Sequence, residues 1–222
     1  MKNQIGITRR DFVTGTLALV AGLGLSACAS GGSTQTGDGS GSPQSAADDS
    51  GSSRGAEGHG GSHKVLVAYF SAQGHTKRVA ERIAKDMDGD TFEVVPEQAY
   101  SDDDLDYNDD NSRVSKEYQD TSLRDIPLSA TAPDSWADYD VVFVGYPIWW
   151  YDYAWPIRHF ASDNDFASKT VIPFCTSVSS GIGGSGKNLA AVAGSGDWQA
   201  GQRFGEDASN GDIDSWVKEL DL

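Results

Sequence analysis

The chain has little cysteine and few positive charges for its length. Of 222 residues only Cys28 and Cys175 are cysteine, and 17 lysines and arginines stand against 33 acidic residues, for a formal net charge of −16. Such a surface disfavours contact with nucleic acid and anionic lipid, so we expect no nucleic-acid partner. The chain also lacks a serine–histidine–aspartate, paired-carboxylate or zinc-ligand pattern, so nothing in it points to hydrolysis.

The first 28 residues have the order of features that is typical of an export signal. Arg9 and Arg10 form a twin-arginine pair, an apolar stretch follows over residues 13–25, and the residues that end at Cys28 resemble a lipobox. A transmembrane anchor is the alternative, but the stretch contains glycine and is shorter than the roughly 20 residues of a spanning helix. We expect residues 1–28 to be a signal peptide, and the lipidated Cys28 to anchor the protein to the extracytoplasmic face of the membrane.

The rest of the chain divides into a linker and one domain. Residues 29–63 are dominated by glycine and serine, which predicts a flexible, disordered tether. Residues 64–222 are enough for one domain with a full core. Cys175 then has no disulfide partner in the domain, and its apolar neighbours favour a buried side chain over a reactive nucleophile.

The domain alternates apolar strands with amphipathic helices. Residues 65–70 form an uncharged apolar run, and the helix that follows repeats Val79, Ile83 and Met87 along one side. Further strands are expected at 91–95, 140–146, 170–175 and 198–204, and further helices at 157–161, 187–193 and 213–220. This alternation predicts an α/β fold with a parallel sheet, in which ligands bind at the carboxyl ends of the strands.

The segment between the first strand and the first helix, residues 71–76, is suited to bind a phosphate. It offers the hydroxyls of Ser71 and Thr76. Gly74 lets the backbone turn so that several N–H groups converge near the positive end of the helix dipole. The alternative is that these small residues only cap the helix.

Two other segments have an unusual composition. Residues 147–156 hold five aromatic side chains at the end of a strand, which favours a ligand or partner site, although the rings could instead cover the sheet edge. Residues 101–110 hold six aspartates around Leu105 and Tyr107. Their spacing does not match a calcium loop, so we expect a solvated acidic loop with Tyr107 folded inward.

A glycine-rich turn over residues 181–186 matches the G-x-G-x-x-G pattern of nucleotide-binding loops. Asn188 stands where a Walker loop needs serine or threonine, and the turn follows a late strand instead of the first one. We therefore favour a turn whose backbone amides approach a flat ligand.

Several strings of residues resemble the flavodoxin-like superfamily, and most closely its short members with a Gly-Tyr-Pro-Ile-Trp-Trp loop. They are residues 69–71 with Gly74 and Thr76, 104–109, 145–150, 172–177, and Trp198 with Arg203 and Phe204. The resemblance implies a three-layer sandwich with a five-stranded parallel sheet in the order 2-1-3-4-5, and one non-covalent FMN. It also implies that the following residues bind the cofactor: Ser71, Ala72, Gln73, Gly74, His75, Thr76, Pro147, Ile148, Trp149, Trp150, Tyr151, Thr176, Ser177, Ser179, Ser180 and Gly181.

Four residues depart from the pattern of those relatives. Tyr151 and Ala154 replace a glycine and a proline after the tryptophans, and Gln73 and Val178 stand where threonine and glycine are common. Access of a substrate is the property most affected, because Tyr151 could stack on the flavin or narrow the pocket.

The function implied by the resemblance is electron transfer, or reduction of a small acceptor such as a quinone. The partner would be a redox protein or a small-molecule electron acceptor, and both a one-electron carrier and an enzyme of the NAD(P)H or quinone reductase type fit. A non-catalytic binding module with the same aromatic pocket is the alternative. The many carboxylates predict a low potential for the second electron, since they disfavour a negatively charged reduced flavin.

Overall fold

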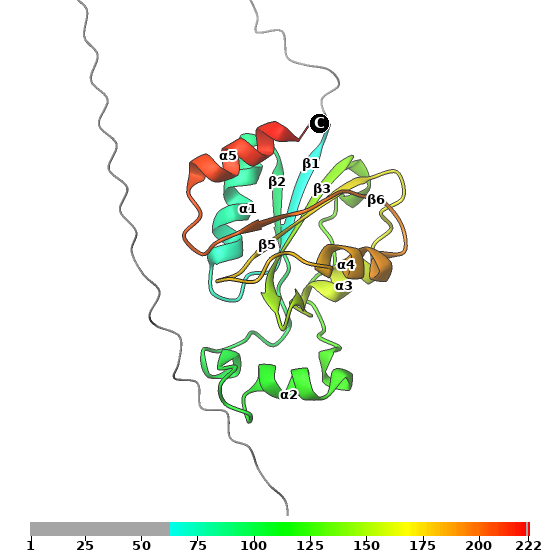
Figure 1. Ribbon diagram of the computed structural model, residues 1–222. Coiled ribbons are helices and arrows are strands. Elements are labelled where there is room, and N and C mark those ends of the chain that lie inside the picture. Colours follow the sequence, from blue (N-terminus) through cyan, green and yellow to red (C-terminus); the bar gives the residue numbers. More distant parts are fainter. Residues whose placement is uncertain (1–62, 221) are drawn as a thin grey trace, which may run out of the picture. The chain divides into compact units, whose positions relative to one another are not determined.

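The computed structural model describes residues 63–220 and residue 222 (Figure 1). The predicted signal peptide (1–28), its lipidation site Cys28 and all but the last residue of the predicted tether (29–63) lie outside the described residues. Within the described part of the chain, no helix is long and apolar enough to cross a membrane.

The sheet has the predicted parallel order. Its strands are β1 (Val65–Tyr69), β2 (Asp90–Glu93), β3 (Val141–Trp149), β5 (Thr170–Thr176), β6 (Asp197–Trp198) and β7 (Gln202–Phe204). The order is β2-β1-β3-β5, and both β6 and β7 pair in parallel with β5. The order 2-1-3-4-5 is thus confirmed, with the fifth strand in two pieces. The break falls opposite Pro173, which has no N–H to donate to a ladder.

Helices cover both faces of the sheet and form the outer layers of a sandwich (Figure 1). One face carries α1 (His75–Asp86) and α5 (Asn210–Glu219), and the other carries α3 (Ile157–Ser162) and α4 (Ser185–Ala193). The predicted apolar side of α1 is buried, with Val79 and Ile83 fully inaccessible to solvent. The α/β sandwich predicted from the sequence is confirmed.

Alternate side chains of the central strands enter two separate cores. Leu66 of β1 and Val142 of β3 pack in the core under α3 and α4, whereas Val67 and Phe143 pack in the core under α1 and α5. Because both faces are covered, these strands are apolar throughout.

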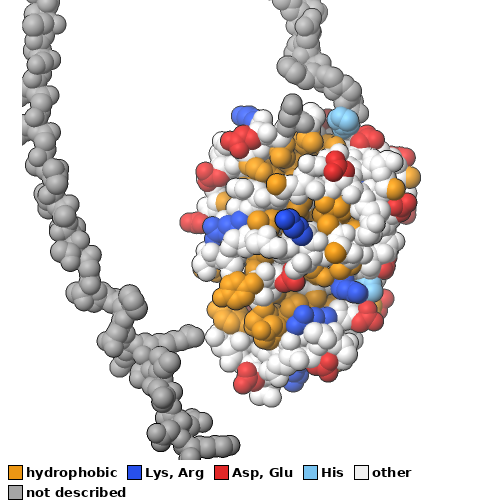
Figure 2. All heavy atoms as spheres, turned by 45° about the vertical axis from the view of Figure 1, so that its right-hand side comes forward, with side chains coloured by type: hydrophobic (Ala, Val, Ile, Leu, Met, Phe, Trp, Pro, Cys, Tyr) orange, Lys and Arg blue, Asp and Glu red, His pale blue; other side chains and the backbone are white. Residues whose placement is uncertain are grey.

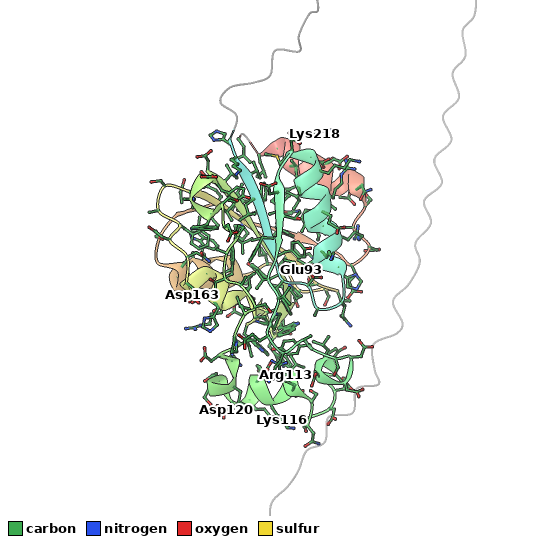
Figure 3. All side chains as sticks on the ribbon, turned by 180° about the vertical axis from the view of Figure 1, so that it is seen from behind. Glu93, Arg113, Lys116, Asp120, Asp163 and Lys218 are labelled. Carbon is green, nitrogen blue, oxygen red and sulfur yellow. The ribbon has the colours of Figure 1, made fainter. Side chains whose placement is uncertain are left out.

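Most of the long segment between β2 and β3 lies outside the three layers, beyond the carboxyl ends of the strands (Figure 1). Its last part lies at the amino ends, where the Trp136 carbonyl accepts a hydrogen bond from Lys169 Nζ. The segment contains α2 (Arg113–Gln119) and three short 3₁₀ helices, η1 (Asp103–Leu105), η2 (Thr121–Arg124) and η3 (Trp136–Asp138). In Figure 3, Arg113 lies on the side of α2 that faces the sheet, whereas Lys116 lies on the opposite side. The segment therefore has one face that can contribute to a site at the sheet edge.

Several boundaries differ from the sequence expectation. β3 extends three residues further, to Trp149, because it turns back into the short antiparallel strand β4 (Asp152–Tyr153). α5 begins at Asn210 instead of residue 213, because Ser209 and Asp212 form a capping box. β2 ends at Glu93, and α4 begins at Ser185.

The expectation that Tyr107 is folded inward was wrong. Its side chain is 71% exposed. The cause is local, since the Asp106 carboxylate accepts a hydrogen bond from the N–H of Asn108 and closes a tight turn around Tyr107.

Candidate functional site

A cavity of about 590 Å³ lies at the carboxyl ends of β1, β3 and β5. Fourteen of the residues predicted to bind a cofactor line it: Ser71, Ala72, Gln73, His75, Thr76, Pro147, Ile148, Trp149, Trp150, Tyr151, Thr176, Ser177, Ser179 and Ser180. Gly74 and Gly181 do not line it. Gly74 shapes the turn of the loop with its positive φ, and Gly181 lies in the turn that leads into α4.

The loop between β1 and α1 is held by one serine hydroxyl. Ser71 Oγ accepts hydrogen bonds from the N–H groups of Gly74 (3.1 Å) and Lys77 (3.2 Å). Gly74 has φ of +88°, in the left-handed region that only glycine adopts at no cost. The alternative that these residues cap the helix is therefore correct for Ser71, although the cap leaves other N–H groups of the loop available.

Those available N–H groups lie at the N-terminal end of α1, beside the cavity. Among the hydrogen bonds of residues 63–220, none is made by the backbone N–H of Gln73, His75 or Thr76. Neighbouring cations are engaged elsewhere, since Lys77 pairs with Glu93 at 2.9 Å and Arg78 donates to the carbonyls of residues 206 and 208. The loop therefore presents donors without a positive side chain, at the positive end of a helix dipole.

Hydrogen bonds join this loop to the turn after β5. The hydroxyls of Thr76 and Thr176 are buried and lie 2.8 Å apart. Arg203 holds the next residues of the turn, donating to the carbonyls of Ser177 (2.6 Å) and Val178 (2.7 Å). Two walls of the cavity are thus fixed relative to each other.

The third wall is the hairpin between β3 and β4. Trp149 pairs with Asp152, and the two residues between them, Trp150 and Tyr151, both have positive φ, of 44° and 67°. This is the conformation of a type I′ turn, in which asparagine and glycine are preferred. An aromatic pair here has a backbone cost of the order of 1 kcal/mol per residue. The Tyr151 side chain is 82% exposed, so it stands at the cavity mouth without closing it.

The aromatic side chains of residues 147–156 divide between the cavity and the core. Trp149, Trp150 and Tyr151 line the cavity, whereas Tyr153 and Trp155 do not. Trp155 is only 4% exposed and packs with Val114 and Ile126. Trp149, Trp150 and Tyr151 therefore lie where the predicted ligand site would be, whereas Trp155 has the alternative, structural role.

Trp149 is surrounded by the edges of other rings. Its centroid lies 4.8 Å from Trp155, 5.4 Å from Tyr100 and 5.6 Å from Phe70, and each pair is near perpendicular. Trp150 instead stacks on Tyr118 at 4.3 Å with an angle of 10° between the rings. Both indoles therefore have partners in the segment between β2 and β3.

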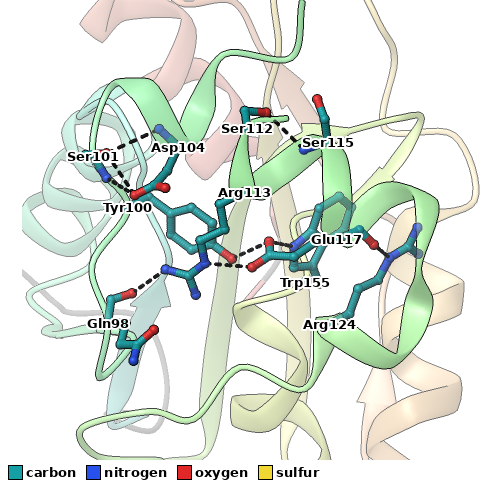
Figure 4. Close-up of polar contacts among 10 residues, drawn as sticks. All are labelled: Gln98, Tyr100, Ser101, Asp104, Ser112, Arg113, Ser115, Glu117, Arg124 and Trp155. Atoms are coloured by element: carbon teal, nitrogen blue, oxygen red, sulfur yellow. Dashed lines mark hydrogen bonds and ion pairs between the residues drawn. The ribbon is translucent and has the colours of Figure 1, made fainter. Parts of the chain in front are cut away.

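A buried carboxylate connects that segment to the aromatic wall. Glu117 of α2 is 3% exposed and accepts hydrogen bonds from Trp155 Nε1 (2.6 Å), Tyr100 Oη (2.7 Å) and Arg113 Nε (2.7 Å), as Figure 4 shows. Glu117 was not predicted as part of the site, because its partner Trp155 lies 38 residues away in the chain.

Five further residues line the cavity that the sequence did not assign to it: Leu105, Tyr107, Val114, Val178 and Glu206. Leu105 and Tyr107 belong to the acidic loop, whose carboxylates of Asp104, Asp106 and Asp109 accept hydrogen bonds from their own turns. Leu105 and Tyr107 of this loop therefore line the cavity, whereas its aspartates stabilise the turns of the loop itself.

The rim of the cavity exposes apolar side chains. Tyr107, Tyr151 and Val178 all lie at its mouth, and each is more than two-thirds exposed. Figure 2 shows hydrophobic side chains gathered at the lower end of one face, the end that carries the carboxyl ends of the strands. Such a patch next to a cavity is typical of a ligand or partner site.

The two groups that could suggest other chemistry have structural roles. Cys175 is fully buried, and burial raises the pKa of its thiol to about 12, so its thiolate is scarce near neutral pH. The expectation of a buried apolar role is confirmed. His159 of α3 is half-buried, with Nε2 2.7 Å from Asp125.

The chain matches the flavodoxin family over residues 64–220. Two crystal structures of candidate flavoproteins resemble it: one from Bacteroides eggerthii, 36% identical over 72% of this chain and 99% of that chain, and one from Bacteroides uniformis, 39% identical over 70% and 98%. Both have a TM-score of 0.65.

A flavoprotein from Lactobacillus acidophilus, crystallised in complex with FMN, shares the fold at 22% identity and a TM-score of 0.51, over 72% of this chain and 99% of that chain. None of the curated proteins compared with the chain matches it. The family match covers residues 64–220, and the parallel sheet has the strand order 2-1-3-4-5. The chain therefore belongs to the flavodoxin family.

Proposed function

We propose that the cavity binds FMN without a covalent bond and that the protein transfers electrons through it. The observation that carries this proposal is the meeting, in one cavity, of a loop of free N–H groups with a wall of indoles. A volume of about 590 Å³ lies within the range of roughly 300–1,000 Å³ that is usual for cofactor sites.

Each part of FMN has a matching part of the cavity. The phosphate would accept hydrogen bonds from the free N–H groups of Gln73, His75 and Thr76, where the helix dipole supplies the favourable potential. The ring system would lie between the hairpin that carries Trp149 and Trp150 and the turn of residues 176–180. Threonine is common at position 73, and the side-chain amide of Gln73 still supplies a hydrogen-bond donor there.

FMN supplies the redox chemistry when it is bound, because its ring system accepts and donates electrons. The residues of this chain would set its potential. The residues that line the cavity include no lysine or arginine, and Glu206 adds a carboxylate. A negatively charged reduced flavin is therefore disfavoured, which supports a low potential for the second electron. A redox titration should show two separate steps; a single two-electron step at high potential would contradict this.

The open mouth supports exchange of electrons with a small acceptor such as a quinone or with a redox protein. Tyr107 and Tyr151 offer exposed rings beside the cavity, on which a planar acceptor could stack. Stopped-flow mixing of the reduced protein with quinones, and in parallel with a one-electron acceptor protein, separates an enzyme from a carrier. Faster oxidation by the quinones indicates an enzyme.

The experiment that tests the proposal is the visible spectrum of the protein purified from its native membrane. We expect the absorption bands of an oxidised flavin, and release of FMN on denaturation. A colourless protein that does not take up FMN in reconstitution would reject the proposal and would favour a non-catalytic binding module.

We also propose that the domain works outside the cytoplasmic membrane, held by a lipid on Cys28. The support is the order of twin arginines, apolar stretch and lipobox within residues 1–28. Replacing Cys28 by alanine should release the protein from washed membranes, whereas replacing Arg9 and Arg10 by lysine should block export. Unchanged fractionation of both variants would reject this location.

A further inference from the structure

We infer that Glu117 is a positioning residue that fixes the indole wall of the cofactor cavity. Glu117 does not itself line the cavity, and it lies on α2, outside the three layers of the sandwich. The inference deepens the proposed function and rests on it, because the wall is taken to contact the flavin. Glu117 acts through two rings that it holds and that in turn hold Trp149.

The first step of the argument is the number of donors that meet at the carboxylate. One oxygen of Glu117 accepts from both Trp155 Nε1 and Tyr100 Oη, and the other accepts from Arg113 Nε (Figure 4). Arg113 is itself fixed, since its Nη1 donates to the Gln98 carbonyl at 2.9 Å. Its guanidinium also lies 3.9 Å from the centre of the Tyr100 ring. The carboxylate is thus the common acceptor of a satisfied buried network.

The second step is the contact of this network with the cavity. Trp155 and Tyr100 pack edge to face on Trp149, at centroid distances of 4.8 and 5.4 Å. The third neighbour, Phe70, comes from the end of the buried β1 run and is 4% exposed. Trp149 therefore has one rigid neighbour from the sheet, and two neighbours whose polar ends are held by one carboxylate.

The third step is that only a carboxylate fits the site. An amide has a single acceptor oxygen, and its NH₂ group is a donor. With glutamine at position 117, the NH₂ group would face either Arg113 Nε or the pair formed by Trp155 and Tyr100. At least one buried donor would then lose its partner, so the rings would shift to find another acceptor or water.

The experiment measures the dissociation constant of FMN for the full-length holoprotein and its variants by flavin fluorescence. We expect Glu117→Gln to weaken FMN binding about tenfold, and to weaken riboflavin binding by the same factor, because the ring wall and not the phosphate loop is affected. Trp149→Ala should also weaken the binding of both FMN and riboflavin. In the double variant, the effect of Glu117→Gln should disappear, since the residue through which it acts is absent.

A merely structural role predicts a different result. If the two substitutions weaken FMN binding additively, Glu117 does not act through Trp149 and the inference is overturned. Near-ultraviolet circular dichroism of the apoprotein provides an independent signal: the indole bands should change in Glu117→Gln. Unchanged indole bands would overturn the inference about Glu117, whether or not the protein binds FMN. Failure of the natural protein to bind FMN would instead reject the proposed function.

Two milder variants serve if Glu117→Gln does not fold. Tyr100→Phe and Trp155→Phe each remove one donor and keep an aromatic ring in place. Each should weaken FMN binding several-fold. The matched control is Tyr139→Phe, which removes a comparable hydrogen bond, from Tyr139 Oη to Asp90 at 2.8 Å, away from the cavity. Equal effects of the three variants would overturn the inference.

Discussion

The phosphate-loop end of the cavity and its indole wall are built in different ways. The loop of residues 71–76 is shaped by neighbours in the chain: Ser71 caps the turn that Gly74 makes possible. The wall is assembled from distant segments, since Trp149 depends on Tyr100 and Trp155, and these meet at Glu117. One end of the site is therefore encoded locally, and the other depends on tertiary packing.

This difference predicts two separable ways to damage the site. A defect in the loop should act on the phosphate alone, so it should lower the affinity for FMN and spare riboflavin. A defect in the wall should act on the ring system, so both ligands should be affected equally. The ratio of the two dissociation constants reports which end has changed.

Trp149→Ala should have the largest effect, because it removes the ring at the centre of the wall. We expect binding of FMN and of riboflavin to weaken by about 1–3 kcal/mol each. Titration by flavin fluorescence measures both constants. An unchanged affinity for either ligand would remove Trp149 from the ring site.

Ser71→Ala should have a smaller effect, restricted to the phosphate. Loss of the cap costs about 1 kcal/mol, or about fivefold in the dissociation constant of FMN, because the turn that orders the N–H groups is loosened. Riboflavin affinity should stay the same. Ser209→Ala, which removes the cap of α5, is the matched control: it should lower stability to urea without any change in FMN affinity. If riboflavin binding weakens as much as FMN binding, the two ends are not separable.

Tyr151→Gly should stabilise the hairpin that carries the wall. Glycine relieves the positive φ of 67°, a gain of about 1 kcal/mol, but it also raises the entropy of the unfolded chain. The net gain in unfolding free energy should be about 0.5 kcal/mol. Urea unfolding measures this free energy. The control is Tyr107→Gly, for which no gain is expected because Tyr107 is an exposed tyrosine without positive φ. A loss of stability would show that the Tyr151 ring makes contacts that outweigh the strain.

As the pH falls, the indole wall should loosen at a higher pH than the loop of residues 71–76. This is the smallest of the four predicted effects. Hydrogen bonds from Ser101 and from Ser122 lower the pKa of Asp104 and Asp120, respectively, below the ordinary value of 3.8. Because the folded pKa is the lower one, their stabilisation is complete above the unfolded pKa and is lost as the pH falls through the folded pKa. No aspartate caps the loop of residues 71–76, where Ser71 does so.

Riboflavin is the probe for this effect, since it has no phosphate to titrate. Its affinity should be constant above the ordinary aspartate pKa of 3.8 in the natural protein and should decline as the pH falls below that value. The decline should be smaller when Asp104 and Asp120 are both replaced by asparagine. An identical decline in the variant would mean that these two carboxylates do not support the wall.

How much of the molecule could be predicted follows the same division. The strand, turn and helix over residues 65–86 have periodic and capping signals that are contained in a short stretch of sequence, and their positions agree with the structure. The strand order followed from the family resemblance. The outward position of Tyr107 and the hairpin that extends β3 were not predicted, because each depends on a particular turn geometry.

The network at Glu117 could not be predicted for a different reason. A glutamate in a short polar helix is usually solvated, and nothing in the sequence relates it to Trp155. The aromatic composition of residues 147–156 indicated a site, but it could not say which rings face the ligand and which one pairs with a buried carboxylate. Only the packing of the segment between β2 and β3 against the hairpin decides that.

The burial of Cys175 gives the domain chemical durability. Oxidants attack thiolates that they can reach, and this thiol is neither ionised near neutral pH nor accessible. Within residues 63–220 it is the sole cysteine, so the folded domain offers no site for sulfenic acid formation or for a mixed disulfide with another protein. Peroxide would therefore find no accessible cysteine thiolate in this part of the chain.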